Sequence, residues 1–218
     1  MSRLWLIAFA SCLASPASAC DTALLLAVDV SGSITREEYH VQMQGLAEAL
    51  IAPEIGQALV TGAVTLSLMQ WSGAGNQQMA LPWTAITGPA DVAAFAGKVA
   101  ALPRPVKFSD TAIAEAIDFS TAQFAAVPAC RRKVIDISGD GVANDGMALP
   151  AARARAMAKG IILNAIAIEA TATSDRMTRY FRRFVITPQG FAITAHEVRD
   201  YPRAIRAKLL RELAGAVS

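Results

Sequence analysis

Residues 22–33 read TALLLAVDVSGS, an apolar run that leads directly into a short polar loop. The run is continuous but short, which favours a strand buried on both faces over a helix. The loop brings one carboxylate, Asp29, and two hydroxyls, Ser31 and Ser33, close together, and Gly32 allows a tight turn. Oxygen ligands of this kind suit a hard cation such as Mg2+ or Ca2+. Taken alone, the pattern is also typical of ordinary turns and helix caps.

The rest of the chain alternates between strand patterns and helix patterns. Pro82 interrupts one expected strand and indicates that this strand lies at a sheet edge. Thr35 and Glu38 form a capping box that opens the first helix. Strands are predicted at 22–28, 64–71, 78–84, 133–138, 161–168 and 191–193, and helices at 35–50, 92–102, 113–124, 150–159, 177–184 and 205–213. This alternation predicts an α/β fold with a doubly wound, mostly parallel, six-stranded sheet and helices on both faces.

Polar residues follow or precede the apolar elements at two further places. Residues 138–141 (Ser-Gly-Asp-Gly) come directly after an apolar strand and contain Asp140. Asp110 and Thr111 stand at the start of a helix, and Thr111 adds a third hydroxyl. Because ligands of open α/β sheets bind beyond the carboxyl ends of the strands, we expect these groups to meet the Asp29 loop at one end of the sheet.

Together these segments resemble the metal-ion-dependent adhesion site of the von Willebrand factor A (vWFA) superfamily. The resemblance covers residues 20–218 and extends to an exported bacterial branch of unknown function. It implies a vWFA-like sheet with one antiparallel edge strand and a site for a divalent cation, Mg2+ in the first place and Mn2+ or Ca2+ as alternatives. The positions that match the family's ligands are Asp29, Ser31, Ser33, Thr111 and Asp140.

The resemblance also implies a use for the cation. Three of the ligands are neutral hydroxyls, so a cation whose aspartates act partly through water keeps much of its charge and attracts a carboxylate from a protein partner. We therefore expect an adhesion-type protein-binding module rather than an enzyme. A metal-dependent hydrolase and a structural domain without metal are the alternatives. An aspartyl phosphatase would need an aspartate where Ser31 stands, and a dinucleotide loop would need a glycine at Asn144.

The chain departs from the family pattern at two positions. Ser109 and Asp110 stand before Thr111, where the family often has glycine, and Gly139 replaces a common threonine. Asp110 is thus a candidate for a carboxylate behind the ligands. Asp136, inside an expected strand, is either such a group or a satisfied core carboxylate. Thr111 has a second interpretation as a helix cap, and residues 144–146 (Asn-Asp-Gly) are typical of a turn.

Residues 1–19 have the organisation of a cleaved secretory signal peptide. Arg3 precedes an apolar run at 4–13, and the small residues 17–19 end the segment as a cleavage site. A buried N-terminal helix is the alternative. Cleavage would leave residues 20–218 as one exported domain, periplasmic or secreted. No later segment reaches the roughly 18 uninterrupted apolar residues that a transmembrane helix needs.

Cys20 and Cys130 remain after cleavage, and an oxidising compartment favours a disulfide between them. Lipidation of Cys20 is the alternative, although a lipoprotein site usually has leucine where Ala17 stands. The resemblance adds a reason for the disulfide. In the superfamily's strand order, strands 22–28 and 133–138 are parallel neighbours. Each cysteine precedes one of them, so the two would meet at the end opposite the metal loops.

Charge excludes some classes of partner. The chain has 20 Lys and Arg against 18 Asp and Glu, a net charge of +2, and removing Arg3 lowers this to +1. No basic run indicates binding to nucleic acid or to an anionic membrane. Met177, Tyr180, Phe181 and Phe184 lie at helical spacing and are interpreted as core.

Overall fold

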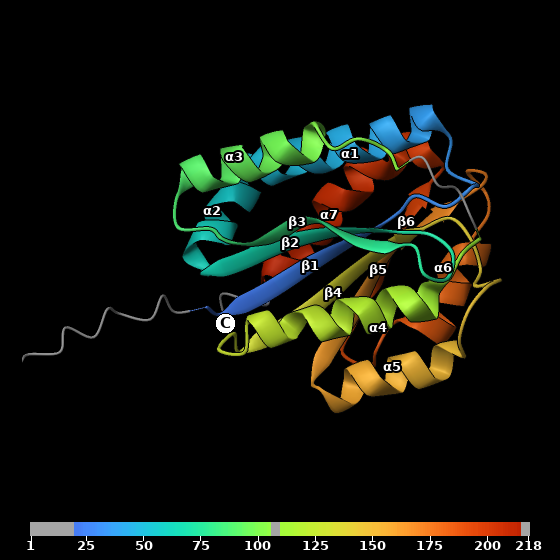
Figure 1. The fold of residues 1–218 in the computed structure, drawn as a ribbon. Coiled ribbons are helices and arrows are strands. Elements are labelled where there is room, and N and C mark those ends of the chain that lie inside the picture. The colour runs from blue at the N-terminus through green and yellow to red at the C-terminus, as the bar shows by residue number, and fades with distance from the viewer. Residues whose placement is uncertain (1–19, 106–109, 215–218) are drawn as a thin grey trace, which may run out of the picture.

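The computed structural model describes residues 20–105 and 110–214, so the expected signal peptide and Ser109 lie outside the described residues. Six strands form one sheet in the order β3-β2-β1-β4-β5-β6 (Figure 1). They are β1 (Thr22–Asp29), β2 (Val64–Trp71), β3 (Gln77–Ala85), β4 (Arg132–Gly139), β5 (Ile161–Glu169) and β6 (Ala192–His196). Only β3 runs antiparallel to its neighbour, at the edge that Pro82 indicated. The predicted fold class is confirmed.

Helices cover both faces of this sheet (Figure 1). They are α1 (Arg36–Ile51), α2 (Pro53–Thr61), α3 (Pro89–Ala100), α4 (Ile113–Gln123), α5 (Leu149–Ala158), α6 (Arg176–Tyr180) and α7 (Tyr201–Ala214), with short helices η1 (Phe124–Ala126), η2 (Phe181–Val185) and η3 (Val198–Asp200). One core lies between the sheet and α1, α2, α3 and α7, and the other between the sheet and α4, α5 and η2. Leu24 and Leu26 of β1 point into the first core and Ala23 and Leu25 into the second, which is why β1 is apolar throughout.

Several elements differ from the sequence predictions, among them α7, which begins at Tyr201 instead of residue 205. Helix α2 was not predicted; Pro53 occupies its start, and Ile55 and Leu59 bury its short apolar face. Strand β6 begins one residue later than expected and extends to His196. The helix expected at 177–184 is α6 continued by the π-helical turn η2. Its wider turn buries Val185 instead of Phe184, which is 39% exposed, so the interpretation of Phe184 as core was wrong.

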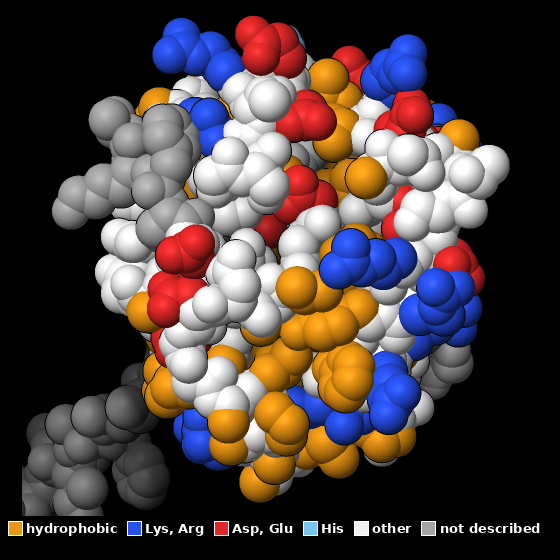
Figure 2. Space-filling model, turned by 90° about the vertical axis from the view of Figure 1, so that its right-hand side faces the viewer, with side chains coloured by type: hydrophobic (Ala, Val, Ile, Leu, Met, Phe, Trp, Pro, Cys, Tyr) orange, Lys and Arg blue, Asp and Glu red, His pale blue; other side chains and the backbone are white. Residues whose placement is uncertain are grey.

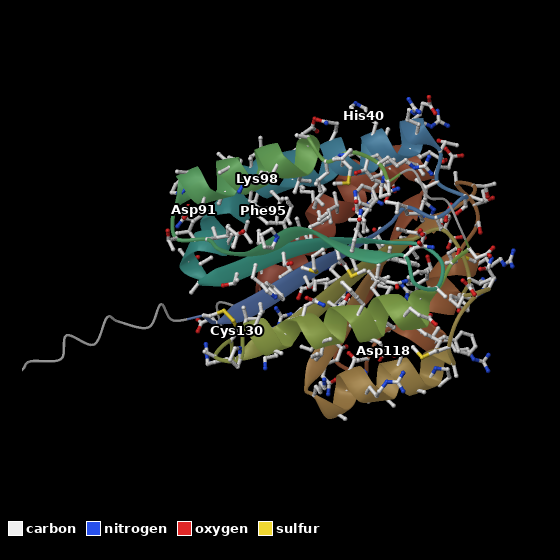
Figure 3. All side chains as sticks on the ribbon, in the orientation of Figure 1. His40, Asp91, Phe95, Lys98, Asp118 and Cys130 are labelled. Carbon is white, nitrogen blue, oxygen red and sulfur yellow. A yellow bond between two sulfur atoms is a disulfide. The ribbon has the colours of Figure 1, made fainter. Side chains whose placement is uncertain are left out.

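A disulfide joins Cys20 to Cys130, as the sequence led us to expect. The two cysteines precede the parallel neighbours β1 and β4, and Figure 3 shows Cys130 at the end of the sheet opposite the loops that follow these strands. In the described part of the chain, no helix has the length and apolarity to cross a membrane.

Candidate functional site

The five residues that match the metal-site pattern come from three segments at one end of the sheet. Strands β1 and β4 are parallel neighbours, with Val28 opposite Ser138, so the loops that follow them leave the sheet side by side. Ser33 Oγ donates a hydrogen bond of 2.7 Å to Asp140 Oδ1 and lies 3.1 Å from Ser31 Oγ. The loop after β1 is thereby connected directly to the loop after β4.

Asp29 lies at the floor of this site. Its side chain is completely buried, and Oδ1 accepts a 2.7 Å hydrogen bond from the backbone N–H of Ser31. Its other oxygen, Oδ2, has no hydrogen-bond partner among residues 20–105 and 110–214. Burial raises the pKa of Asp29 to about 7. Hydrogen bonds from Ser31 oppose this rise, the charge of Asp140 adds to it, and a hydrogen bond from the Asp140 backbone opposes it. Within residues 20–105 and 110–214, the site therefore holds a buried carboxyl for which no neighbouring positive charge lowers the pKa.

Asp140 and Ser33 lie nearer to solvent. Burial raises the pKa of Asp140, the hydrogen bond from Ser33 lowers it, and the charge of Glu38 raises it further. Ser33 is exposed, whereas Ser31 and Thr111 are buried. The site is thus closed beneath Asp29 and open beside Ser33, so that a group from outside the molecule can reach it.

Two glycines allow the three segments to approach. A Cβ atom at Gly139 would lie 3.0 Å from Asp29 Oδ2, and one at Gly141 would lie 3.1 Å from Thr111 Oγ1. Both distances are tighter than nearly all real Cβ contacts. Glycine at 139, the departure from the family pattern, therefore gives the Asp29 carboxyl room beside β4. The same contacts place Asp29 beside Gly139 and Thr111 beside Gly141, the two residues that flank Asp140 in the chain.

Asn144 holds the third segment in position, a role that its sequence did not reveal. Its side-chain Oδ1 accepts a 2.8 Å hydrogen bond from the Thr111 N–H, and its own backbone N–H donates to the Thr111 carbonyl at 3.1 Å. Nearby, Asp145 Oδ2 accepts a 2.7 Å hydrogen bond from the Ala74 N–H. Residues 144–146 therefore form a bent loop segment, and the side chains of Asn144 and Asp145 connect it to neighbouring loops.

Comparison with known protein families shows to which family the chain belongs. The profile of the family described as "Protein of unknown function (DUF1194)" matches residues 19–217. The chain belongs to this family. No curated protein matches it by sequence.

Solved structures show that the fold is that of a vWFA domain. The proximal thread matrix protein 1 (PTMP1) of the mussel byssus, in a form with a zinc-occupied MIDAS motif, has a TM-score of 0.64 and 15% identity over 89% of this chain and 48% of its own. The pilus adhesin SpaC of Lactobacillus rhamnosus GG gives 0.65 and 16% over 91% and 31%. A von Willebrand factor type A protein of Catenulispora acidiphila gives 0.61 and 14% over 90% and 43%. The chain thus spans less than half of each of these solved chains.

The two further carboxylates singled out in the sequence lie differently. Asp110 is exposed ahead of α4. Asp136 is 4% exposed and forms an ion pair with Lys208 of α7, inside the first core. The structure therefore gives Asp136 a basic partner in the core rather than a place behind the site hydroxyls.

A pocket of about 470 Å3 adjoins the open side of the site, and its charged lining is mostly acidic. Asp140 forms part of its wall, together with Glu37, Glu38, Glu169 and Glu197, and Arg199 is the one basic residue among the described residues that line it. Figure 2 shows acidic side chains near the middle of this face. In the described part of the chain, no three His, Cys, Asp or Glu side chains are grouped as a metal site. A cation at this end would therefore need the hydroxyls of Ser31, Ser33 and Thr111 as well as carboxylates.

Proposed function

We propose that this protein is an exported, adhesion-type binding module that uses a divalent cation to bind an acidic group of a protein partner. Asp29, Ser31, Ser33, Thr111 and Asp140 would hold the cation. When bound, the cation supplies a positive centre with a position open toward solvent, where a partner's carboxylate binds. The protein's own side chains fix the cation and orient that open position; no bond is made or broken.

The observation that carries the proposal is the buried Asp29 carboxyl. Its Oδ2 is without a hydrogen-bond partner among the described residues and faces Gly139 in the crowded centre of the site. A buried carboxylate without a positive partner is costly, and a bound cation removes that cost. The donors around it are carboxylate and hydroxyl oxygens, which suit Mg2+, Mn2+ or Ca2+ better than softer metals.

The similar structures support the same use of this end of the fold. One is PTMP1 with zinc in its MIDAS motif, and another is a pilus adhesin. The disulfide between Cys20 and Cys130 supports export, because such bonds persist in oxidising compartments. The exposed Ser33 and the half-exposed Asp140 leave the site accessible to a large partner.

Thermal unfolding in Mg2+, Mn2+, Ca2+ and chelator tests the proposal. A ligand at about 100 times its Kd stabilises the native state by about 2.7 kcal/mol. For a chain of this size, that corresponds to a rise in Tm of roughly 5–10 °C. We expect such a rise for the wild type and none for Asp29→Ala. An equal Tm of the wild type in metal and in chelator would contradict the proposal.

Asp118→Ala is the matched control. Asp118 lies on α4 (Figure 3), is not one of the five residues that match the metal-site pattern, and accepts hydrogen bonds from Arg155 Nε at 2.9 Å and from Nη2 at 2.5 Å. Loss of such an exposed pair changes stability by at most about 1 kcal/mol. We expect this variant to keep the full metal-dependent rise, which shows that Asp29, rather than any aspartate, is required.

A further inference from the structure

A cluster of basic side chains lies beside the candidate metal site. Helix α6 and the turn η2 carry four exposed arginines: Arg176, Arg179, Arg182 and Arg183. Six arginines elsewhere form ion pairs. Within the described part of the chain, Arg179 is the only one of these four in an ion pair, with Asp175. Much of the positive charge of this segment is therefore not neutralised within the fold.

Aromatic rings lie among these arginines. Tyr180 and Phe184 pack with their ring centroids 5.2 Å apart, and the Arg183 guanidinium lies 5.1 Å from the centre of the Phe184 ring. Two shallow pockets, of about 620 and 680 Å3, flank this ring pair. Val142 and the four arginines line one, and Met147, which is 49% exposed, lines the other. The surface thus offers apolar contact area that is bordered by arginines on the side of α6 and η2 and by Asp145 on the side of the Met147 pocket.

This surface is connected to the candidate metal site. Val142 and Ala143 follow Asp140 by two and three residues, and the Ala143 N–H donates a 3.1 Å hydrogen bond to the Tyr180 hydroxyl. Beneath it, a Cβ on Gly139 would lie 3.4 Å from Phe181 of η2. Figure 2 shows hydrophobic side chains bordered by Lys and Arg below the acidic centre of this face. One partner can therefore reach both regions.

The charges on the two sides of Asp140 differ in sign. Toward α1 and β6 lies the acidic pocket that contains Glu37 and Glu197, and toward α6 lie the arginines. A partner segment rich in carboxylates is repelled from the first side and attracted to the second. The guanidinium group also suits carboxylates, because its planar donors bind them in a bidentate manner.

We infer that the surface of Val142, Tyr180, Phe184 and the arginines of α6 and η2 binds an acidic segment of the protein partner that also carries an apolar side chain. The apolar side chain packs against Tyr180 and Phe184, and the flanking carboxylates pair with the arginines. The inference rests on the proposed function, since the same partner places one carboxylate on the cation. It adds the direction in which the bound segment runs, from Asp140 toward α6.

Fluorescence anisotropy with a defined peptide tests the inference. The probe is a labelled peptide in which glutamates flank one phenylalanine, and the comparison peptide has glutamine for every glutamate. We expect the wild type in Mg2+ to bind the glutamate peptide and not the glutamine peptide. The double variant Arg182→Glu, Arg183→Glu should bind it at least about tenfold more weakly, and Phe184→Ser should also weaken it. The double variant Arg131→Glu, Lys133→Glu makes the same charge change near the disulfide and should bind normally.

The outcomes separate this inference from the proposed function. Binding that needs Mg2+ and Asp29 but is unchanged by charge reversal at 182 and 183 overturns the inference alone. Binding that persists in chelator and in Asp29→Ala, but is lost on charge reversal, supports binding by the arginine surface. It contradicts the proposal that the partner binds through the cation. No binding of the glutamate peptide by the wild type overturns the inference. So does binding only to phosphatidylglycerol vesicles, since the surface would then recognise a membrane.

Discussion

At the scale of single residues, burial of Asp29 favours one protonation state and cation binding requires the other. Folding buries its carboxyl beside the Asp140 carboxylate; burial, and to a lesser extent that charge, raise its pKa to about 7 and disfavour the ionised form. The ionised form is the one that binds a cation. Under the proposed function, stability of the metal-free protein and metal binding therefore make opposite demands on this one side chain, as is common at functional sites.

The pH dependence of the stability of the variant Asp29→Asn tests this opposition. A folded-state pKa raised from 3.8 to about 7 makes the native state hold its proton longer than the unfolded state. The stability of the wild type relative to Asp29→Asn is therefore greatest below about pH 4, and it falls as pH rises through 7. In chelator, denaturant unfolding should show the variant and the wild type nearly equal at pH 4. By pH 8 the variant should be more stable, by up to about 4 kcal/mol. A constant difference across this range would show that Asp29 is ionised throughout.

The sequence predicted which residues would gather at the site but not what holds them there. Asp29 and Asp140 each follow an apolar strand, and parallel strands end at the same edge, so their meeting was predictable. Asn144 was not recognised as more than a turn residue, because its hydrogen bonds reach Thr111, which is distant in sequence. The space that Gly139 leaves beside Asp29 is likewise a property of packing between two loops.

At the scale of elements, a buried ion network fastens α7 to the sheet. Lys208 and Glu212 of α7 are completely buried, and Lys208 pairs with Asp136 of β4 and, at 3.0 Å, with Glu212. Glu212 also pairs with Arg132 and accepts a 2.5 Å hydrogen bond from Asn164. Two positive and two negative side chains therefore balance inside the core. The sequence showed only the apolar stripe of this helix, because the i,i+4 spacing of Lys208 and Glu212 does not reveal that β4 supplies their partners.

The variant Lys208→Met tests how much the ion network contributes to the free energy of unfolding. Removing the lysine leaves the Asp136 carboxylate buried without its positive partner, and such losses cost roughly 3–5 kcal/mol. We expect urea unfolding at pH 7 to show a decrease of that size. The double variant Lys208→Met, Asp136→Leu keeps Arg132 with Glu212 and should regain most of the loss. If the double variant were as unstable as the single one, packing rather than charge would explain the effect.

At the scale of the whole molecule, the disulfide and the candidate site lie at opposite ends of the sheet. The disulfide between Cys20 and Cys130 closes a loop with a sequence separation of 110 residues at one end, and the candidate site lies at the other. In the chain-entropy model, a loop of about this length stabilises the fold by roughly 4–5 kcal/mol. The bond can therefore support the central strands without contacting the site.

Cys20→Ser with Cys130→Ser tests this separation. We expect a loss of roughly 4–5 kcal/mol in denaturant unfolding, while the rise in Tm on adding Mg2+ keeps its wild-type size. A variant that lost its metal response while still folded would show that the two ends are coupled through β1 and β4.

The central claim is that a cation binds among the three loops, and anomalous diffraction from crystals grown with Mn2+ tests it most directly. We predict one strong anomalous peak at about 2.0–2.5 Å from oxygens of the set Asp29, Ser31, Ser33, Thr111 and Asp140, and its loss in Asp29→Ala. No peak among these residues at saturating Mn2+, or a peak only in the acidic pocket beside Glu169 and Glu197, would contradict the claim.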